Sequence, residues 1–165
     1  MAVPADTDVA LARLSLGYAA AVDALDGEAF ADLFTEDGEL WVPDLAGSGA
    51  PTIRRAGRVQ LLAIPSGLAR YQATHHAIRA ATYVVTGQTA TGEVDGVAHH
   101  LLATDATGPG GVDVIWYLRY VDEYVTTAVG WRISRRVLHL RALEERRVAH
   151  LGPGRVYPRP AGNDS

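Results

Sequence analysis

Residues 75–105 read HHAIRAATYVVTGQTATGEVDGVAHHLLATD. The stretch holds two runs rich in β-branched and aromatic residues, separated by the turn signal Gly87-Gln88. The second half of the chain continues in this way, with long β-rich runs between glycine-containing turns. The runs are 75–86, 89–105, 112–126 and 131–143. They predict a meander of long antiparallel strands.

The first third of the chain has a helical period instead. Apolar residues recur there at spacings of three and four, which is typical of one face of an amphipathic helix. These residues are Leu11, Leu14, Tyr18, Val22 and Leu25. Asp6 or Thr7 is expected to cap this helix, and Asp26 a short second one. Residues 35–38 predict a turn and residues 39–42 a short strand. Residues 43–57, rich in Pro, Gly and Ala, predict a loop, and a third helix is expected over 58–64.

Helices followed by strands predict an α+β fold. We expect a cone-shaped α+β barrel, with N-terminal helices packed on a curved, mostly antiparallel sheet. Residues 1–151 would form this domain and residues 152–165 an irregular tail. The wide end of such a cone can enclose a small ligand.

Composition excludes several classes of protein. The 165 residues suit one domain, and the net charge of −4 includes no dense Lys/Arg run, so nucleic-acid binding is not expected. The absence of cysteine excludes disulfides and thiolate chemistry. No apolar run reaches the roughly 18 residues of a membrane span, and the N-terminus lacks the features of a signal peptide. A cytoplasmic location is therefore expected.

Three stretches resemble the SnoaL-like, NTF2-like superfamily. They are YAAAVDALDGEAFADLFTEDGELWV (18–42), ATHHAIRAATYVVTGQTATGEV (73–94) and YLRYVDEYVTTAVGWRISRRV (117–137). The resemblance covers about residues 8–142 and is more specific for fold than for reaction. The superfamily includes dehydratases, a dehydrochlorinase, polyketide cyclases, isomerases and non-catalytic members, so fold alone does not assign a function.

The resemblance implies a catalytic group of Asp26, His75 and His100. In scytalone dehydratase and the dehydrochlorinase, an aspartate of the first helical hairpin supports a histidine at the start of a long strand. Asp26 and His75 match those positions, and His100 matches a second pocket histidine. Histidine ordinarily titrates near neutrality, and a hydrogen-bonded aspartate fixes its tautomer. His75 is the expected base, Asp26 its orienting group, and His100 a second acid/base or a hydrogen-bond donor.

Alternatives exist for each member of this group. Asp26 can simply cap the second helix, and Asp23 lies close to the same helix face. Adjacent strand residues point to opposite faces, so only one histidine of each pair, 75–76 and 99–100, can face the pocket. Alternation with the small residues of 92–98 favours His100 over its neighbour.

Further side chains are expected to contact the substrate. They are Trp41, Tyr18, Tyr71, Trp116 and His139. The adjacent histidine pairs diverge and lack metal-binding spacings, so neither a metal site nor a cofactor is expected.

These observations predict a cofactor-independent lyase or isomerase-type enzyme, a dehydratase or cyclase. Its substrate would be a small, hydrophobic, carbonyl-bearing molecule, with a role in secondary metabolism. The alternatives are a non-catalytic binding module and a structural subunit of this fold. The strand VDVIWYLRYV, residues 112–121, is apolar on both faces and suggests a homodimer or a higher homo-oligomer.

Overall fold

The computed structural model describes residues 5–103 and 109–154. The helical elements all precede the long strands. They are α1 (Ala5–Ala24), α2 (Gly27–Ala31), α3 (Arg58–Leu62) and the 3₁₀ helix η1 (Pro65–Leu68). The strands are β1 (Phe34–Pro43), β2 (Pro51–Ala56), β3 (Ala73–Thr86), β4 (Thr89–Ala103), β5 (Gly111–Thr127) and β6 (Gly130–Val148). The predicted α+β class is confirmed.

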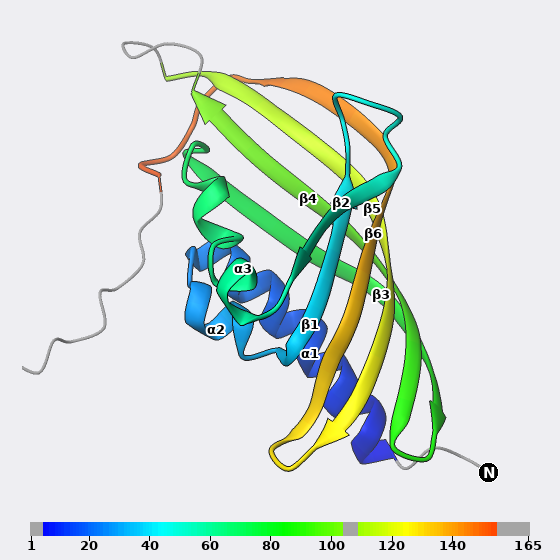
Figure 1. Ribbon diagram of the computed structural model, residues 1–165. Coiled ribbons are helices and arrows are strands. Elements are labelled where there is room, and N and C mark those ends of the chain that lie inside the picture. Colours follow the sequence, from blue (N-terminus) through cyan, green and yellow to red (C-terminus); the bar gives the residue numbers. More distant parts are fainter. Residues whose placement is uncertain (1–4, 104–108, 155–165) are drawn as a thin grey trace, which may run out of the picture.

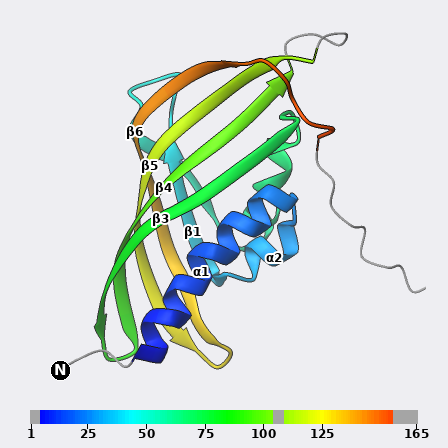
Figure 2. The same ribbon diagram turned by 180° about the vertical axis from the view of Figure 1, so that it is seen from behind.

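In the described part of the chain, these strands form a single sheet in the order β2-β1-β6-β5-β4-β3. All neighbours are antiparallel except β1 and β6, which are parallel. The sheet is strongly curved and does not close, and the helices lie on its concave side (Figures 1 and 2). This is the predicted cone, with α1 crossing the inside of the sheet next to β3.

The core lies between α1 and the concave face of the sheet. The apolar stripe predicted for the first helix is buried within α1, with Leu11 fully inaccessible and Val22 2% exposed. Its last predicted member, Leu25, follows the helix and is half-buried. Aromatic rings join the helices to the sheet: Tyr18 packs on Phe30 at 5.0 Å and on Tyr120 at 5.3 Å between ring centroids. Burial of this stripe, rather than helix propensity alone, holds α1 on the sheet.

A buried ion pair ties α1 to the last two strands. Arg136 donates to both carboxylate oxygens of Asp122, at 2.9 and 2.6 Å, and to the hydroxyl of Ser15 at 3.1 Å. Its guanidinium lies over the rings of Tyr18 and Tyr120, at 4.4 and 4.3 Å. Both residues of the pair are inaccessible, so the contacts compensate for the cost of removing their charges from water.

Three segments differ from the sequence expectation. Residues 51–56, predicted as loop, form edge strand β2. Strand β1 starts at Phe34 and crosses the expected turn at 35–38 with an irregular register. Strand β6 continues to Val148, beyond the predicted end at 143. In β1 and β2, pairing with a neighbouring strand outweighs the local turn residues. The end of β6 is extended by its pairing with the first residues of β5.

None of the helices in the described ranges is long and apolar enough to cross a membrane. Most of the predicted tail, from 155 onward, lies outside the described residues.

Candidate functional site

A cavity of about 510 Å³ opens on the concave side of the sheet. Its wall includes Tyr18 of α1, the inner side of the β1–β2 hairpin, and η1 with the residues that follow it. His76, His100 and Trp116 line it from β3, β4 and β5. The cavity therefore brings titratable side chains together with an apolar lining, as small-molecule sites do.

An aspartate–histidine pair lies at this cavity. The Nδ1 atom of His76 is 2.7 Å from Oδ1 of Asp23. Asp23 also accepts hydrogen bonds from the backbone N–H of His76 and from the hydroxyl of Thr74, both at 2.8 Å. The two side chains are 10% and 15% exposed. Three donors from one strand thus hold a carboxylate of the helix in a fixed position.

These hydrogen bonds determine which group carries the proton. Burial raises the pKa of Asp23, but the hydrogen bonds from His76 and Thr74 outweigh it, and the pKa lies below its usual value. Because Asp23 is ionised, Nδ1 of His76 carries a hydrogen and donates it to the carboxylate. The other ring nitrogen, Nε2, has no hydrogen-bond partner among the described residues. It is the atom that can accept a proton.

His100 is the second imidazole of the cavity, and a backbone carbonyl rather than a carboxylate accepts its Nδ1 hydrogen. It is 4% exposed, and its Nδ1 donates to the carbonyl of Val114 at 3.0 Å. Burial lowers the pKa of His100 to about 4, and the bond to Val114 only partly opposes this. At neutral pH the ring is uncharged, so its Nε2 accepts hydrogen bonds and does not donate them. Of the roles predicted for His100, this tautomer allows that of a base and differs from that of an acid or a hydrogen-bond donor.

Aromatic contacts fix the position of His100. Its ring centroid lies 4.9 Å from that of Tyr71, 5.6 Å from that of His76 and 5.3 Å from that of Trp116. The indole Nε1 of Trp116 is a buried donor without a partner in the described part of the chain. One side of the cavity is thus a cluster of rings with a few polar atoms.

The predicted pairing of Asp26 with His75 does not form. Asp26 caps α2 by accepting a hydrogen bond from the N–H of Ala29 at 2.9 Å. His75 is exposed on the convex face, where its ring is 6.4 Å from that of His99. The structure brings together the two alternatives instead, Asp23 and His76, together with His100.

A β-bulge explains the exchange of the two histidines. From the Gly87-Gln88 turn, β3 and β4 pair regularly as far as Ala80 opposite Asp95. The next pair is Ile78 opposite Gly96, so Arg79 is an extra residue in β3. Without that residue His75 would pair with His100 and share its face; with it, His75 pairs with His99. One extra residue moves a side chain to the other face of a sheet.

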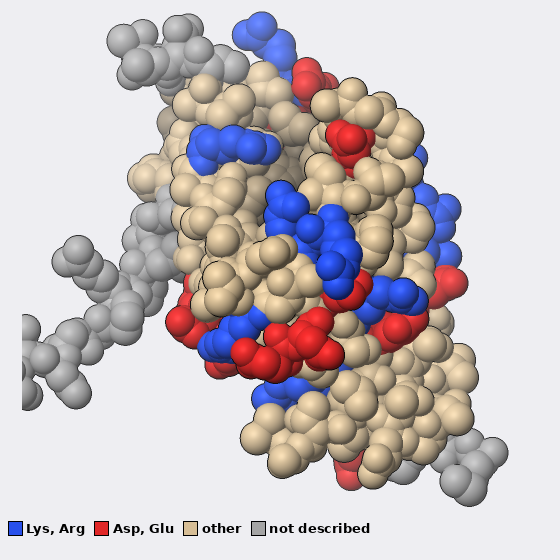
Figure 3. Space-filling model, in the orientation of Figure 1, with Lys and Arg blue, Asp and Glu red and all other residues tan. Residues whose placement is uncertain are grey.

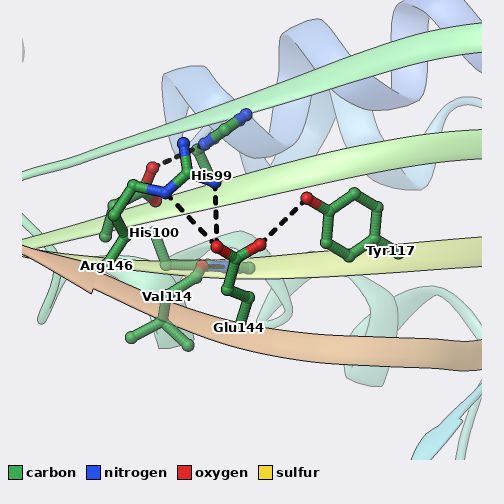
Figure 4. A network of polar contacts seen from close by, with 7 residues as sticks. His99, His100, Val114, Tyr117, Glu144 and Arg146 are labelled. Carbon is green, nitrogen blue, oxygen red and sulfur yellow. Dashed lines mark hydrogen bonds and ion pairs between the residues drawn. The ribbon is translucent and has the colours of Figure 1, made fainter.

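The convex face carries its own polar network (Figure 4). Nδ1 of His99 lies 2.7 Å from Oδ2 of Asp113. Nearby, Glu144 accepts from the Tyr117 hydroxyl at 3.1 Å and from Nη2 of Arg146 at 2.8 Å. In Figure 4 these side chains lie in front of the strands with the helix behind them, so they are outside the cavity.

Of the five residues predicted to contact the substrate, three line the cavity and two do not. Tyr18, Tyr71 and Trp116 line the cavity. Trp41 does not, because it points to the outer side of its hairpin and donates to Glu39 at 2.8 Å. His139 is exposed and is also not among the lining residues.

Two residues at the cavity were not anticipated from sequence, Arg55 and Arg70. Arg55 lies on β2, which was expected to be loop, and no motif marks Arg70. As for metals, no group of three or more His, Asp or Glu side chains suited to an ion occurs within residues 5–103 and 109–154.

Comparisons with known proteins agree with this architecture. A model of the SnoaL-like domain matches residues 5–137. An NTF2-like protein with a cystatin-like fold from Novosphingobium aromaticivorans is 25% identical, with 82% of each chain covered and a TM-score of 0.62. No protein of curated function matches the sequence.

Two structures of named activity share the fold at lower identity. A candidate scytalone dehydratase from Novosphingobium aromaticivorans is 24% identical, with 93% of this chain and all of that chain covered and a TM-score of 0.69. The hexachlorocyclohexane dehydrochlorinase LinA-type3 from Novosphingobium barchaimii is 17% identical, with 93% and 96% covered and a TM-score of 0.67. At these identities the likeness concerns the fold alone.

Proposed function

The chain belongs to the SnoaL-like family, and from this membership and its cavity we propose that it is a lyase or isomerase-type enzyme using Asp23 and His76 as a general base. The reaction is a dehydration or a related elimination on a small, hydrophobic, carbonyl-bearing molecule. The observation that carries the proposal is the 2.7 Å contact between Nδ1 of His76 and Asp23 at the cavity that His76 lines. Nε2 of His76 has no hydrogen-bond partner within residues 5–103 and 109–154.

Proton abstraction is the first step. Nε2 of His76 takes the proton from the carbon next to the substrate carbonyl, and the C–H electron pair passes into an enolate. The ring then carries a positive charge, which the ionised carboxylate of Asp23 stabilises at 2.7 Å. Because Asp23 is already hydrogen-bonded in place, little reorganisation accompanies this change of charge.

Loss of the leaving group completes the elimination. The enolate electrons form the carbon–carbon double bond, and the bond from the β-carbon to its hydroxyl breaks. The proton held on His76 passes to the departing hydroxide, so the products are an enone and water. His76 thus returns to its neutral form, because the proton that it took from carbon leaves with the water.

Other cavity residues supply hydrogen bonds to substrate oxygens. The Tyr71 hydroxyl accepts from Nη2 of Arg70 at 2.9 Å, which polarises its own O–H toward a carbonyl oxygen. The ring of Trp116 forms part of the same wall, and its indole N–H is buried. Neutral His100 accepts a hydrogen bond through Nε2, which can position the substrate hydroxyl before the elimination, while the proton for the leaving oxygen comes from His76.

The test uses 3-hydroxy-1-tetralone, a β-hydroxy ketone that loses water and tautomerises to the strongly absorbing 1-naphthol. We expect the wild-type protein to accelerate naphthol formation and His76→Ala to abolish the acceleration. His99→Ala is the matched control, because it removes an imidazole with the same carboxylate contact from the convex face. Equal rates for wild type and His76→Ala would contradict the proposal.

A non-catalytic binding module is the competing function, and one observation favours it. His100 is held by a backbone carbonyl rather than by a carboxylate, as in a ring that only shapes a pocket. This alternative predicts ligand binding without turnover, unaffected by Asp23→Asn. Solvent deuterium exchange at the α-carbon of 1-tetralone separates the two, because only the enzyme accelerates it.

A further inference from the structure

The mouth of the cavity carries two arginines from different parts of the chain. Arg55 comes from β2, and Arg70 follows η1; both line the cavity and both are exposed. Figure 3 shows basic side chains beside the hollow on this face of the molecule. The mechanism proposed above uses Arg70 only through the Tyr71 hydroxyl and does not use Arg55.

Arg55 faces the cavity because of the register of its hairpin. It pairs with Leu40, and Ile53 pairs with Val42, so the four side chains share the inner side of β1 and β2. The preceding residue, Arg54, faces the other way and forms an ion pair with Glu39. Arg55 has no carboxylate partner among the described residues; its Nη1 donates to a backbone carbonyl at 3.1 Å. Because successive side chains of β2 alternate between its two sides, Arg54 has a carboxylate partner and the positive charge of Arg55 has none among the described residues.

Arg70 is oriented toward the site by Tyr71. Its guanidinium lies 4.8 Å from the centre of the tyrosine ring and donates to the hydroxyl. The same ring packs on His100. In the described part of the chain, no carboxylate pairs with Arg70. Its remaining N–H groups are therefore available beside the aromatic wall.

The carboxylates near the cavity do not cancel these charges. Asp44 is the acidic residue among the described residues that line it. Its Oδ1 accepts from the backbone N–H of Ala46 and Gly47, at 3.1 and 3.2 Å, and so serves the hairpin turn. Asp23 has His76 as its ionic partner. The mouth of the cavity therefore carries two positive charges, on Arg55 and Arg70, and one negative charge, on Asp44, so its net charge is positive.

We propose that the substrate of this site is an organic oxyanion, whose apolar body enters the cavity while Arg55 and Arg70 bind its anionic group at the mouth. The planar guanidinium matches a carboxylate or a phosphate in geometry, and its charge-assisted hydrogen bonds are strong. An uncompensated positive rim also draws anions toward the cavity. The claim that the bound anion is a substrate rests on the function proposed above. The claim that the site binds an anion does not depend on that function.

The test compares 2-naphthoate with 2-naphthamide, its neutral counterpart of nearly the same shape, by titration calorimetry. We expect the wild-type protein to bind the carboxylate about tenfold more tightly. The double variant Arg55→Gln/Arg70→Gln should lose this preference and bind both compounds alike. Arg13→Gln is the matched control, because it removes one exposed cation of α1 that does not line the cavity, and the preference should persist.

The outcomes separate this inference from the catalytic one. Equal binding of the two compounds by the wild type, or a preference that survives in the double variant, overturns it even if His76→Ala is inactive. Conversely, a preference lost only in the double variant supports it even if no turnover occurs. 2-Naphthyl phosphate distinguishes the sources of the anion: binding tighter than 2-naphthoate identifies a phosphate, and weaker binding identifies a carboxylate.

Discussion

The two faces of the sheet carry the same pair of side chains in nearly the same geometry. On the concave face, Nδ1 of His76 lies 2.7 Å from Asp23; on the convex face, Nδ1 of His99 lies 2.7 Å from Asp113. The surroundings differ. The His76 side chain is 10% exposed beside the cavity, whereas that of His99 is 35% exposed.

This difference shows that an aspartate–histidine contact does not by itself define an active site. On the convex face, water competes for the imidazole, and neither His99 nor Asp113 lines the cavity. On the concave face, Tyr71, His100 and Trp116 exclude water and strengthen each polar contact. Enclosure, rather than the pair, separates the candidate base from its external counterpart.

Removing the imidazoles tests the comparison most directly. His76→Ala should lower the rate of 1-naphthol formation by about 10²–10⁴-fold, because a general base contributes about that much. His99→Ala should leave the rate within about twofold, since the side chain does not line the cavity. Steady-state kinetics measure both, and a loss in the His99 variant alone would reverse the assignment of the two faces.

Replacing the carboxylates should have the next largest effect. Asp23→Asn keeps the shape but removes the charge that stabilises an imidazolium, so kcat should fall about 10²-fold or more. Asp113→Asn is the counterpart on the convex face and should leave kcat unchanged. Substrate affinity should stay the same in both variants, because neither carboxylate lines the cavity. If kcat fell equally in both variants, the enclosure argument would be wrong.

The buried His100 should give the protein an acid-sensitive stability. Its pKa is lowered in the folded state to about 4, from an ordinary value near 6.5. Between these values the unfolded chain binds the proton and the folded chain does not, so stability is complete above pH ~6.5 and falls as the pH drops toward 4. The loss is about 2–3 kcal/mol.

Urea unfolding at pH 7 and pH 4.5 measures this effect. His100→Phe should reduce the difference in unfolding free energy between the two pH values, because it removes the group that titrates. His75→Gln changes an exposed histidine of the neighbouring strand and should keep the difference. An undiminished pH dependence in His100→Phe would show that other groups cause it.

The smallest expected effect concerns Asp26. Asp26→Ala should cost about 1 kcal/mol of stability, because the N–H of Ala29 loses its cap. The rate of naphthol formation should be unchanged. Thermal unfolding and kinetics together test this, and a large kinetic defect with normal stability would restore Asp26 to the site.

Much of the fold follows from local patterns in the sequence. The stripe of Leu11, Tyr18 and Val22 predicts α1 and its buried face, because a helical period identifies a face without knowledge of its partner. The alternation that ends at His100 likewise predicts that this ring is inside, and it is 4% exposed. Strand β2 was not predicted. It is an edge strand in a Pro- and Gly-rich segment, and pairing with its neighbour stabilises it rather than its own composition.

The sequence by itself therefore determined the class of fold, the buried face of α1 and the inward direction of His100. Only the tertiary structure decided that His76 and Asp23, rather than His75 and Asp26, meet at the cavity. For the histidines, the physical reason is the extra residue at Arg79, which shifts the pairing of β3 on β4 by one position. For the aspartates, it is that Asp26 caps α2 while Asp23 faces the donors of β3. The register decides which face of the sheet a side chain points to. The register itself is set by contacts between two strands, so the sequence of one strand does not determine it.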